Sequence, residues 1–337
     1  MEIIAKKFFD AIAKDSGFIK KWIIAWDYQL KRKKTHKKYN DSLPEDFFSY
    51  NGPEDLISWL NWFSVDYPDY FPREMVFPLL EKSKIIDKSL LTQLNLKFDY
   101  ELYEKRVGIN NVHDYLIPNL YPVPERNRIK NILDFGAGYG RQANLWTSQV
   151  ENPVFVGMDA IPKSYCLQNL YYSNLNQNFF EYLDNPDKFK IDLDKKGIYH
   201  IPTWRSDLIP GGSFDLVICV QVLPELNSKL IRHMINEFKR ILKPGGMLYI
   251  RDHASKWKPA GKINFEKYLR NNGFVLEFQP HVINDLDIFG IPRIWRKKDE
   301  QVIKSQKAQI KDKFKQFYRD CDASLSGLLS KTIKKFK

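Results

Sequence analysis

The stretch NILDFGAGYGR, residues 131–141, is the most informative segment of the chain. A short apolar run leads directly into glycines at positions 136, 138 and 140. Glycine permits the sharp turn and the close backbone approach that are needed where a strand ends beneath a ligand and a helix begins. The first amide groups of that helix then face the ligand. The stretch predicts a strand–turn–helix unit at a ligand site, although the glycines alone would also suit a dinucleotide.

Strand-like and helix-like segments alternate from this turn to about residue 298. The strand candidates are Asn131–Phe135, Val154–Met158, Ile198–Pro202, Phe214–Val220, Met247–Arg251, Phe274–Phe278 and Pro292–Lys297. Helix candidates fall at about 141–149, 162–180, 228–242 and 263–272. Such alternation predicts an α/β fold with a doubly wound, mostly parallel sheet and helices on both faces.

The chain divides into three regions by this pattern. Residues 1–125 predict a helical, aromatic-rich N-terminal cap that also contacts substrate, with Ile4, Phe8 and Ile12 at helical spacing. Within it, the proline-rich stretch from Asp66 to Pro78 predicts an irregular loop. Residues 126–298 form the α/β core, and residues 299–337 form a basic amphipathic helical tail.

Composition limits the class of protein. Aromatic residues make up 15% of the 337 residues, which suits a groove for flat ligands such as sugars or bases. Residues 296–337 contribute +8 of the net charge of +12, so the basic character belongs mainly to this C-terminal stretch and argues little for nucleic acid. Three widely spaced cysteines indicate neither a disulfide framework nor a zinc site. Without a signal-like or membrane-spanning apolar run, a cytoplasmic location is expected.

Three further motifs follow the glycine turn in order. They are VFVGMD (154–159), SFDLVICVQVL (213–223) and RILKPGGMLYI (240–250). Together with LDFGAGYGR they resemble the class I S-adenosylmethionine-dependent methyltransferase family over about residues 128–298. The resemblance implies a Rossmann-like, doubly wound, seven-stranded and mostly parallel sheet whose last strand is antiparallel. It also implies S-adenosyl-L-methionine (AdoMet) as the cofactor.

The resemblance assigns cofactor roles position by position. The turn glycines line the methionine and ribose portions, and Asp134 orients the turn or reaches the cofactor's amino group through water. Asp159 accepts hydrogen bonds from the ribose hydroxyls, and Gln221 lies beneath the sulfonium. The adenine contact falls on Thr203 or Trp204, with Asp207 as an alternative, whereas Asp215 is predicted to be structural. The cofactor-binding candidates are Asp134, Gly136, Ala137, Gly138, Gly140, Asp159, Trp204 and Gln221.

Catalytic candidates are expected where the acceptor enters, above the carboxyl ends of the strands. The enzyme must align the acceptor with the methyl group and often removes a proton. Asp252 and His253 directly follow the MLYIR strand, Glu225 follows QVLP, and His113 precedes the core beside Asp114. Asp252 and His253 would equally suit a structural role as caps of the strand-end loop. No tight metal-ligand spacing is present, so no metal is predicted.

A finer resemblance points to the acceptor. DAIPKSYCLQNLYYS (159–173) and GIPRIWRK (290–297), with the aromatic N-terminal region, resemble bacterial sugar O-methyltransferases associated with surface glycans. This implies methyl transfer to a hydroxyl of a sugar or surface-glycan precursor. One alternative is an RNA or cap methyltransferase, suggested by KRKKTHKK (31–38) and the tail. Another is a catalytically silent methyltransferase fold that serves as a binding subunit, against which the intact turn and Asp159 argue.

The tail has an apolar stripe at helical spacing, with lysines between its members: Ile303, Ile310, Phe314 and Phe317 with Lys304, Lys307, Lys311 and Lys315. A helix of this kind can pack on its own domain, pair two copies into a homo-oligomer, or contact a membrane surface peripherally. Nucleic acid is the remaining alternative.

Overall fold

The computed structural model describes residues 2–15, 50–62, 71–101, 103–120, 129–175, 177–223, 226–252, 264–279 and 291–298. Residues 1–297 form one compact unit. The basic run at 31–38, Glu225, His253 and the tail from residue 299 lie outside the described residues, so what was predicted for them stays a prediction.

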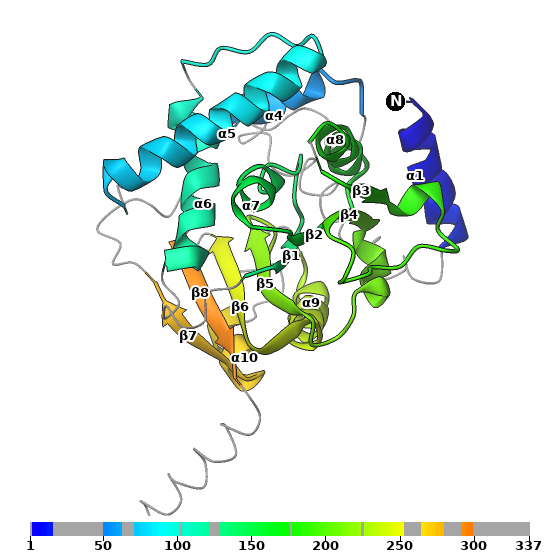
Figure 1. Cartoon of the computed structure of the whole chain (residues 1–337). Helices are drawn as coiled ribbons and strands as arrows, with labels where there is room; N and C mark the ends of the chain where they lie inside the picture. The colour runs from blue at the N-terminus through cyan, green and yellow to red at the C-terminus, as the bar shows by residue number, and fades with distance from the viewer. Residues whose placement is uncertain are drawn as a thin grey trace, which may run out of the picture. The chain divides into compact units, whose positions relative to one another are not determined.

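An eight-stranded sheet forms the centre of the molecule, in the order β3-β4-β2-β1-β5-β6-β8-β7 (Figure 1). Every pair between β3 and β6 is parallel, whereas β8 is antiparallel to both β6 and β7. The predicted mostly parallel sheet with an antiparallel last strand is confirmed. The strands are β1 (Asn131–Phe135), β2 (Val154–Asp159), β3 (Phe179–Glu181), β4 (Gly197–Pro202), β5 (Phe214–Val220), β6 (Leu242–Asp252), β7 (Phe274–Phe278) and β8 (Ile291–Lys297).

The central strands are buried along nearly their whole length and are mostly apolar, because both faces of the sheet are covered. All five residues of β1 are buried. Leu133 and Phe135 join one hydrophobic core, whereas Ile132 joins a second core on the opposite face. Alternate residues of a strand point to opposite faces, so a strand between two helical layers is apolar at most of its positions.

The helices divide between these two cores. On one face lie α1 (Glu2–Lys14), α9 (Ser228–Ile241) and α10 (Phe265–Asn271). On the other lie α4 (Asp55–Trp62), α5 (Arg73–Gln93), α6 (Ile109–Leu120) and α7 (Ala143–Gln149) (Figure 1). Helix α8 (Pro162–Ser173) contributes to both, through Tyr165 and Tyr172 respectively. The N-terminal region therefore places α1 and α4–α6 on different cores.

Two parts of the chain differ from the sequence-based prediction. The short edge strand β3 makes the sheet eight-stranded rather than seven-stranded, and it begins within the stretch 162–180 that was predicted to be helical. The loop predicted for Asp66–Pro78 is wrong from Arg73 onward, where α5 begins directly after Pro72. Pro78 removes one helical hydrogen bond, but burial of Val76, Leu80 and the residues that follow at helical spacing outweighs that loss.

Asp215 is structural, as predicted. Its carboxylate accepts the backbone N–H groups of Lys130 (3.0 Å) and Asn131 (2.9 Å) and pairs with Lys243 (2.6 Å). These contacts fasten the start of β1 to β5, at the end of the strands opposite to the glycine turn.

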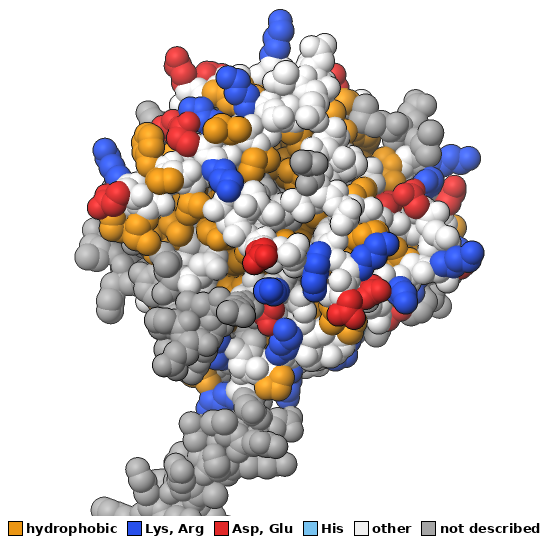
Figure 2. Space-filling view, in the orientation of Figure 1, with side chains coloured by type: hydrophobic (Ala, Val, Ile, Leu, Met, Phe, Trp, Pro, Cys, Tyr) orange, Lys and Arg blue, Asp and Glu red, His pale blue; other side chains and the backbone are white. Residues whose placement is uncertain are grey.

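The surface is mixed in character. On the face drawn in Figure 2, hydrophobic side chains gather over α5, where Met75, Phe77 and Ile85 are exposed. Lysine and arginine side chains are interspersed there with acidic ones, as on an ordinary solvated surface.

Candidate functional site

The carboxyl ends of β1, β2, β4, β5 and β6 share one edge of the sheet because these strands run parallel. β1 pairs with β2 on one side and β5 on the other, so the chain order reverses there. Open α/β sheets bind ligands at the carboxyl edge beside such a reversal. The structure places Asp134, Asp159 and Gln221 at this edge, at or just beyond the ends of the three strands.

The three turn glycines all have positive φ, of 69°, 60° and 93° at Gly136, Gly138 and Gly140. A Cβ at Gly136 would lie 2.4 Å from Val222, and one at Gly140 would lie 2.5 Å from Tyr172. At Gly138 the nearest atom would be on Trp59, at an ordinary contact distance of 3.5 Å. Packing therefore explains the outer two glycines, and only the middle one faces room that a ligand can use.

Two buried carboxylates flank the turn. Asp159 accepts the backbone N–H groups of Ile161 (2.9 Å) and Gly138 (3.2 Å), whereas Oδ2 of Asp134 has no hydrogen-bond partner among the described residues. Burial raises the pKa of each carboxyl group to about 7. Arg141 opposes this rise at Asp134, and backbone N–H groups oppose it at Asp159. The charge of both groups therefore changes near neutral pH, and a cationic ligand favours their ionised form.

Helix α6 is fastened to the turn through Asp114. Its carboxylate receives hydrogen bonds from Arg251 (Nε and Nη2, both 2.8 Å), from Arg141 (2.5 Å) and from the hydroxyl of Tyr249 (2.5 Å). Burial alone would raise the pKa of Asp114, but Arg251 and Arg141 lower it to about 2. Arg141 directly follows Gly140, so this cluster ties α6, β6 and the start of the next helix together.

Helix α4, which belongs to the N-terminal region, also lies against the glycine turn. Trp59 provides the side chain nearest to Gly138, and Asp55 at the start of α4 accepts a hydrogen bond from Lys163 of α8 (3.1 Å). Both partners of that ion pair are largely buried. The pairing holds an aromatic ring over the middle glycine.

Two other cofactor candidates have different surroundings. Gln221 adopts a φ of 56°, which is unfavourable for a residue with a side chain, and its N–H bonds the carbonyl of Arg251 (3.0 Å). Trp204 lies on the 3-10 helix η5 (Thr203–Leu208) after β4, where its indole N–H donates to Asp15 (3.0 Å). The ring of Trp204 packs on Phe8 of α1.

The catalytic candidates are only partly brought together. Asp252 is buried and is the last residue of β6. It directly follows Arg251, whose carbonyl accepts the N–H of Gln221. His113 is buried on α6 with its ring edge-on to Phe71, at a centroid distance of 5.8 Å. Glu225 and His253 lie outside the described residues.

Four residues of this region were not singled out from the sequence: Trp59, Arg141, Gln168 and Tyr172. The position of Arg141 directly after the last turn glycine was the one available signal. Gln168 and Tyr172 lie on α8, which is buried on nearly every side, so periodicity could not show which way they point.

Within the described residues, no group of three or more His, Cys, Asp or Glu side chains is arranged to hold a metal ion. None of the described helices is long and apolar enough to cross a bilayer.

Residues 110–286, more than half of the chain, match a family described as a methyltransferase domain. The chain therefore belongs to this methyltransferase family. No curated protein matches.

Solved structures with a similar fold include methyltransferases from three organisms. The SAM-dependent methyltransferase of Methanosarcina mazei is 18% identical, covering 54% of this chain and 100% of that one, with a TM-score of 0.37. The N-methyltransferase NodS of Bradyrhizobium japonicum, solved with S-adenosyl-L-homocysteine, is 12% identical over 65% and 99%, with a TM-score of 0.40. A TehB-like SAM-dependent methyltransferase of Corynebacterium glutamicum is 18% identical over 64% and 98%, with a TM-score of 0.38.

Proposed function

We propose that the chain is an AdoMet-dependent methyltransferase whose cofactor binds across Gly138. The observation that carries this proposal is the positive-φ glycine turn between two buried carboxylates, inside a methyltransferase domain. The residues fit the cofactor in three respects. Gly138 leaves room beside Trp59, Oδ2 of Asp134 has no hydrogen-bond partner among the described residues, and both carboxylates titrate where a cationic ligand can ionise them.

AdoMet, when bound, supplies an electrophilic methyl group. The chain's own residues would hold and shield it: Asp159 would accept hydrogen bonds from the ribose hydroxyls, Asp134 would pair with the amino group, and Trp59 would cover the turn. Such positioning and exclusion of water are the main contributions of a protein to a displacement reaction.

For the acceptor we propose a hydroxyl of a sugar or surface-glycan precursor. The motifs of residues 159–173 and 290–297 support it, as does the high aromatic content, because aromatic faces pack against the apolar face of a pyranose. A hydroxyl acceptor has to lose a proton. Asp252 ends β6, whose carboxyl end the acceptor would approach, and His253 is the next residue in the sequence.

The test is methyl transfer from isotope-labelled AdoMet to a panel of nucleotide sugars, glycans and RNA. Label in a saccharide, lost in a folded Asp159→Ala variant, is the expected result. Label only in RNA would favour the RNA alternative, and AdoMet binding without transfer to any acceptor would favour the silent binding subunit. Absence of AdoMet binding in calorimetry would contradict the proposal as a whole.

A further inference from the structure

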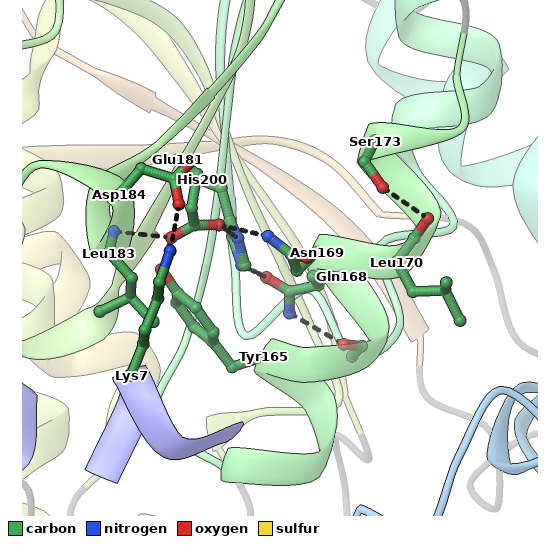
Figure 3. A network of polar contacts seen from close by, with 11 residues as sticks. Lys7, Tyr165, Gln168, Asn169, Leu170, Ser173, Glu181, Leu183, Asp184 and His200 are labelled. Carbon is green, nitrogen blue, oxygen red and sulfur yellow. Dashed lines mark hydrogen bonds and ion pairs between the residues drawn. The ribbon is translucent and has the colours of Figure 1, made fainter. Parts of the chain in front are cut away.

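A chain of buried polar side chains runs from the sheet edge to the glycine turn (Figure 3). Glu181 of β3 pairs with Nδ1 of His200 on β4 at 2.6 Å. Nε2 of His200 lies 3.0 Å from Oε1 of Gln168 on α8. The amide nitrogen of Gln168 then donates to the carbonyl of Gly138 (2.8 Å) and, more distantly, to Asp159 (3.3 Å).

The donors and acceptors along this chain are consistent with one arrangement. The Gly138 carbonyl can only accept, so the NH₂ group of Gln168 faces it and the amide oxygen faces His200. Nε2 of His200 must therefore carry a proton. Nδ1 faces the carboxyl group of Glu181, which also accepts hydrogen bonds from Tyr165 (2.5 Å) and Asn169 (2.8 Å).

The pairing is supported by the surroundings of both groups. Burial alone would raise the pKa of Glu181, but the positive charge of His200 lowers it. The titratable groups that face His200 are Glu181 from β3 and Tyr165 and Tyr172 from α8, with Asp159 reached through Gln168. Among these groups Glu181 is the direct partner of the His200 ring, at 2.6 Å.

Gln168 touches both halves of the cofactor site. Asp159 accepts the N–H of Gly138 at the same oxygen that Gln168 approaches. The side chain of Gln168 thus holds the carbonyl of Gly138 in place relative to the carboxylate of Asp159, which accepts the N–H of the same glycine. A reversed amide would set its oxygen against the Gly138 carbonyl and loosen this arrangement.

We propose that Gln168 is a positioning residue of the cofactor site and that the buried Glu181–His200 pair holds its amide in the productive orientation. This inference rests on the proposed function, since the ligand that the turn positions is AdoMet. The residues concerned, Gln168, Glu181 and His200, support the glycine turn and do not themselves touch the reacting atoms.

The first test replaces Gln168 by Met, which keeps its length and removes both hydrogen-bonding groups. AdoMet affinity, measured by calorimetry, is expected to fall about tenfold, the effect of losing one hydrogen bond in a buried site. The matched control is Ser173→Ala, which removes a hydrogen bond within the same helix, from Ser173 to the carbonyl of Leu170 (3.2 Å), and leaves Glu181, His200 and Gln168 unchanged. Its AdoMet affinity is expected to stay within twofold of the wild type. Equal affinity for Gln168→Met and the wild type would overturn the proposal.

The second test uses His200→Phe, which keeps an aromatic ring beside Tyr165 and Phe179 and removes the nitrogen that faces Gln168. AdoMet affinity is expected to fall by at least about threefold. The double variant with Gln168→Met is expected to bind no more weakly than Gln168→Met alone, because His200 acts through Gln168. Additive losses would indicate a purely structural role, and wild-type affinity in a folded His200→Phe protein would overturn the role of the pair.

Nitrogen-15 NMR of histidine-labelled protein shows which ring nitrogen of His200 carries a proton. A proton on Nε2 is expected in the wild type, because the amide oxygen of Gln168 faces that nitrogen. An Nε2 without a proton would overturn the inference whether or not AdoMet binds. Failure of the wild type to bind AdoMet would instead reject the proposed function, so the two failures are distinguishable.

Discussion

At the scale of single residues, the turn glycines differ in what a side chain would displace. Gly138→Ala adds a methyl group at a site with room but forces a residue with a side chain into positive φ, which costs roughly 1–2 kcal/mol. The variant is expected to fold and to bind AdoMet at least tenfold more weakly, because the methyl group lies where the cofactor approaches. Calorimetry and thermal unfolding measure the two effects.

Gly136→Ala is the matched comparison. Its Cβ would meet Val222 at 2.4 Å, so a larger loss of thermal stability is expected than at Gly138. Wild-type AdoMet affinity in Gly138→Ala would place the cofactor elsewhere.

The two carboxylates beside the turn predict a pH dependence of stability. In the folded protein Asp134 keeps its proton up to about pH 7, whereas an unfolded carboxyl loses it near 3.8. The ligand-free folded state therefore binds more protons between these values, and its free energy of unfolding falls as the pH rises through this window. Asp134→Asn removes this contribution, so its midpoint of thermal unfolding is expected to vary less between pH 5 and 7, with a gain over the wild type at pH 8. Parallel curves for the two proteins would contradict the assignment.

His253 is the residue that we expect to take the acceptor's proton or to orient the group that does. His253→Ala is expected to lower kcat by roughly 10²–10⁴-fold while AdoMet affinity stays near that of the wild type. A fall of less than about tenfold in the transfer assay would shift the role of base to Glu225 or His113.

At the scale of elements, α6 depends on one carboxylate to stay on the core. Asp114→Asn keeps the shape of the side chain but leaves Arg251 and Arg141 without their buried counter-charge. Breaking such a pair costs about 3–5 kcal/mol, measured as the free energy of unfolding in urea. Because the pKa of Asp114 is lowered to about 2, this stabilisation is fully present above pH 4 and is lost as the pH falls through 2.

Asp207→Asn, on η5, provides the comparison with an exposed ion pair. Asp207 pairs with Arg205 at 2.9 Å but is substantially exposed, so a change of no more than about 1 kcal/mol is expected. Equal effects of the two substitutions would mean that the Asp114 cluster does not anchor α6.

At the scale of the whole molecule, the basic tail is proposed to be a docking helix rather than a part of the active site. Residues 1–297 form a compact unit, so a chain ending at Lys298 is expected to fold and to keep its AdoMet affinity. Packing of the tail on the protein itself or in a homo-oligomer predicts that truncation lowers solubility or changes the mass seen by light scattering. Loss of liposome co-sedimentation with solubility retained would favour membrane contact, and a folded truncated protein that no longer binds AdoMet would refute the docking role.

Much of the fold could be predicted from local patterns in the sequence. The central predicted strands form because strands covered on both faces are mostly apolar, and such runs can be recognised in the sequence. The glycines after Asn131–Phe135 and the acid ending β2 could likewise be assigned, since the turn needs residues without side chains at fixed spacing. β3 was missed because three residues are too few to show a period.

Tertiary structure alone decided how the site is supported. Gln168 meets Gly138 across 30 residues of sequence, and Arg141 meets Asp114 across 27. No local periodicity encodes such pairings, because each joins side chains of elements that meet only when the layers pack. The sequence by itself determined that a methyltransferase turn is present between two acids. The packing of α4, α6 and α8 decided which residues cover it, anchor it and hold its middle glycine, because buried polar groups must find partners wherever folding brings them.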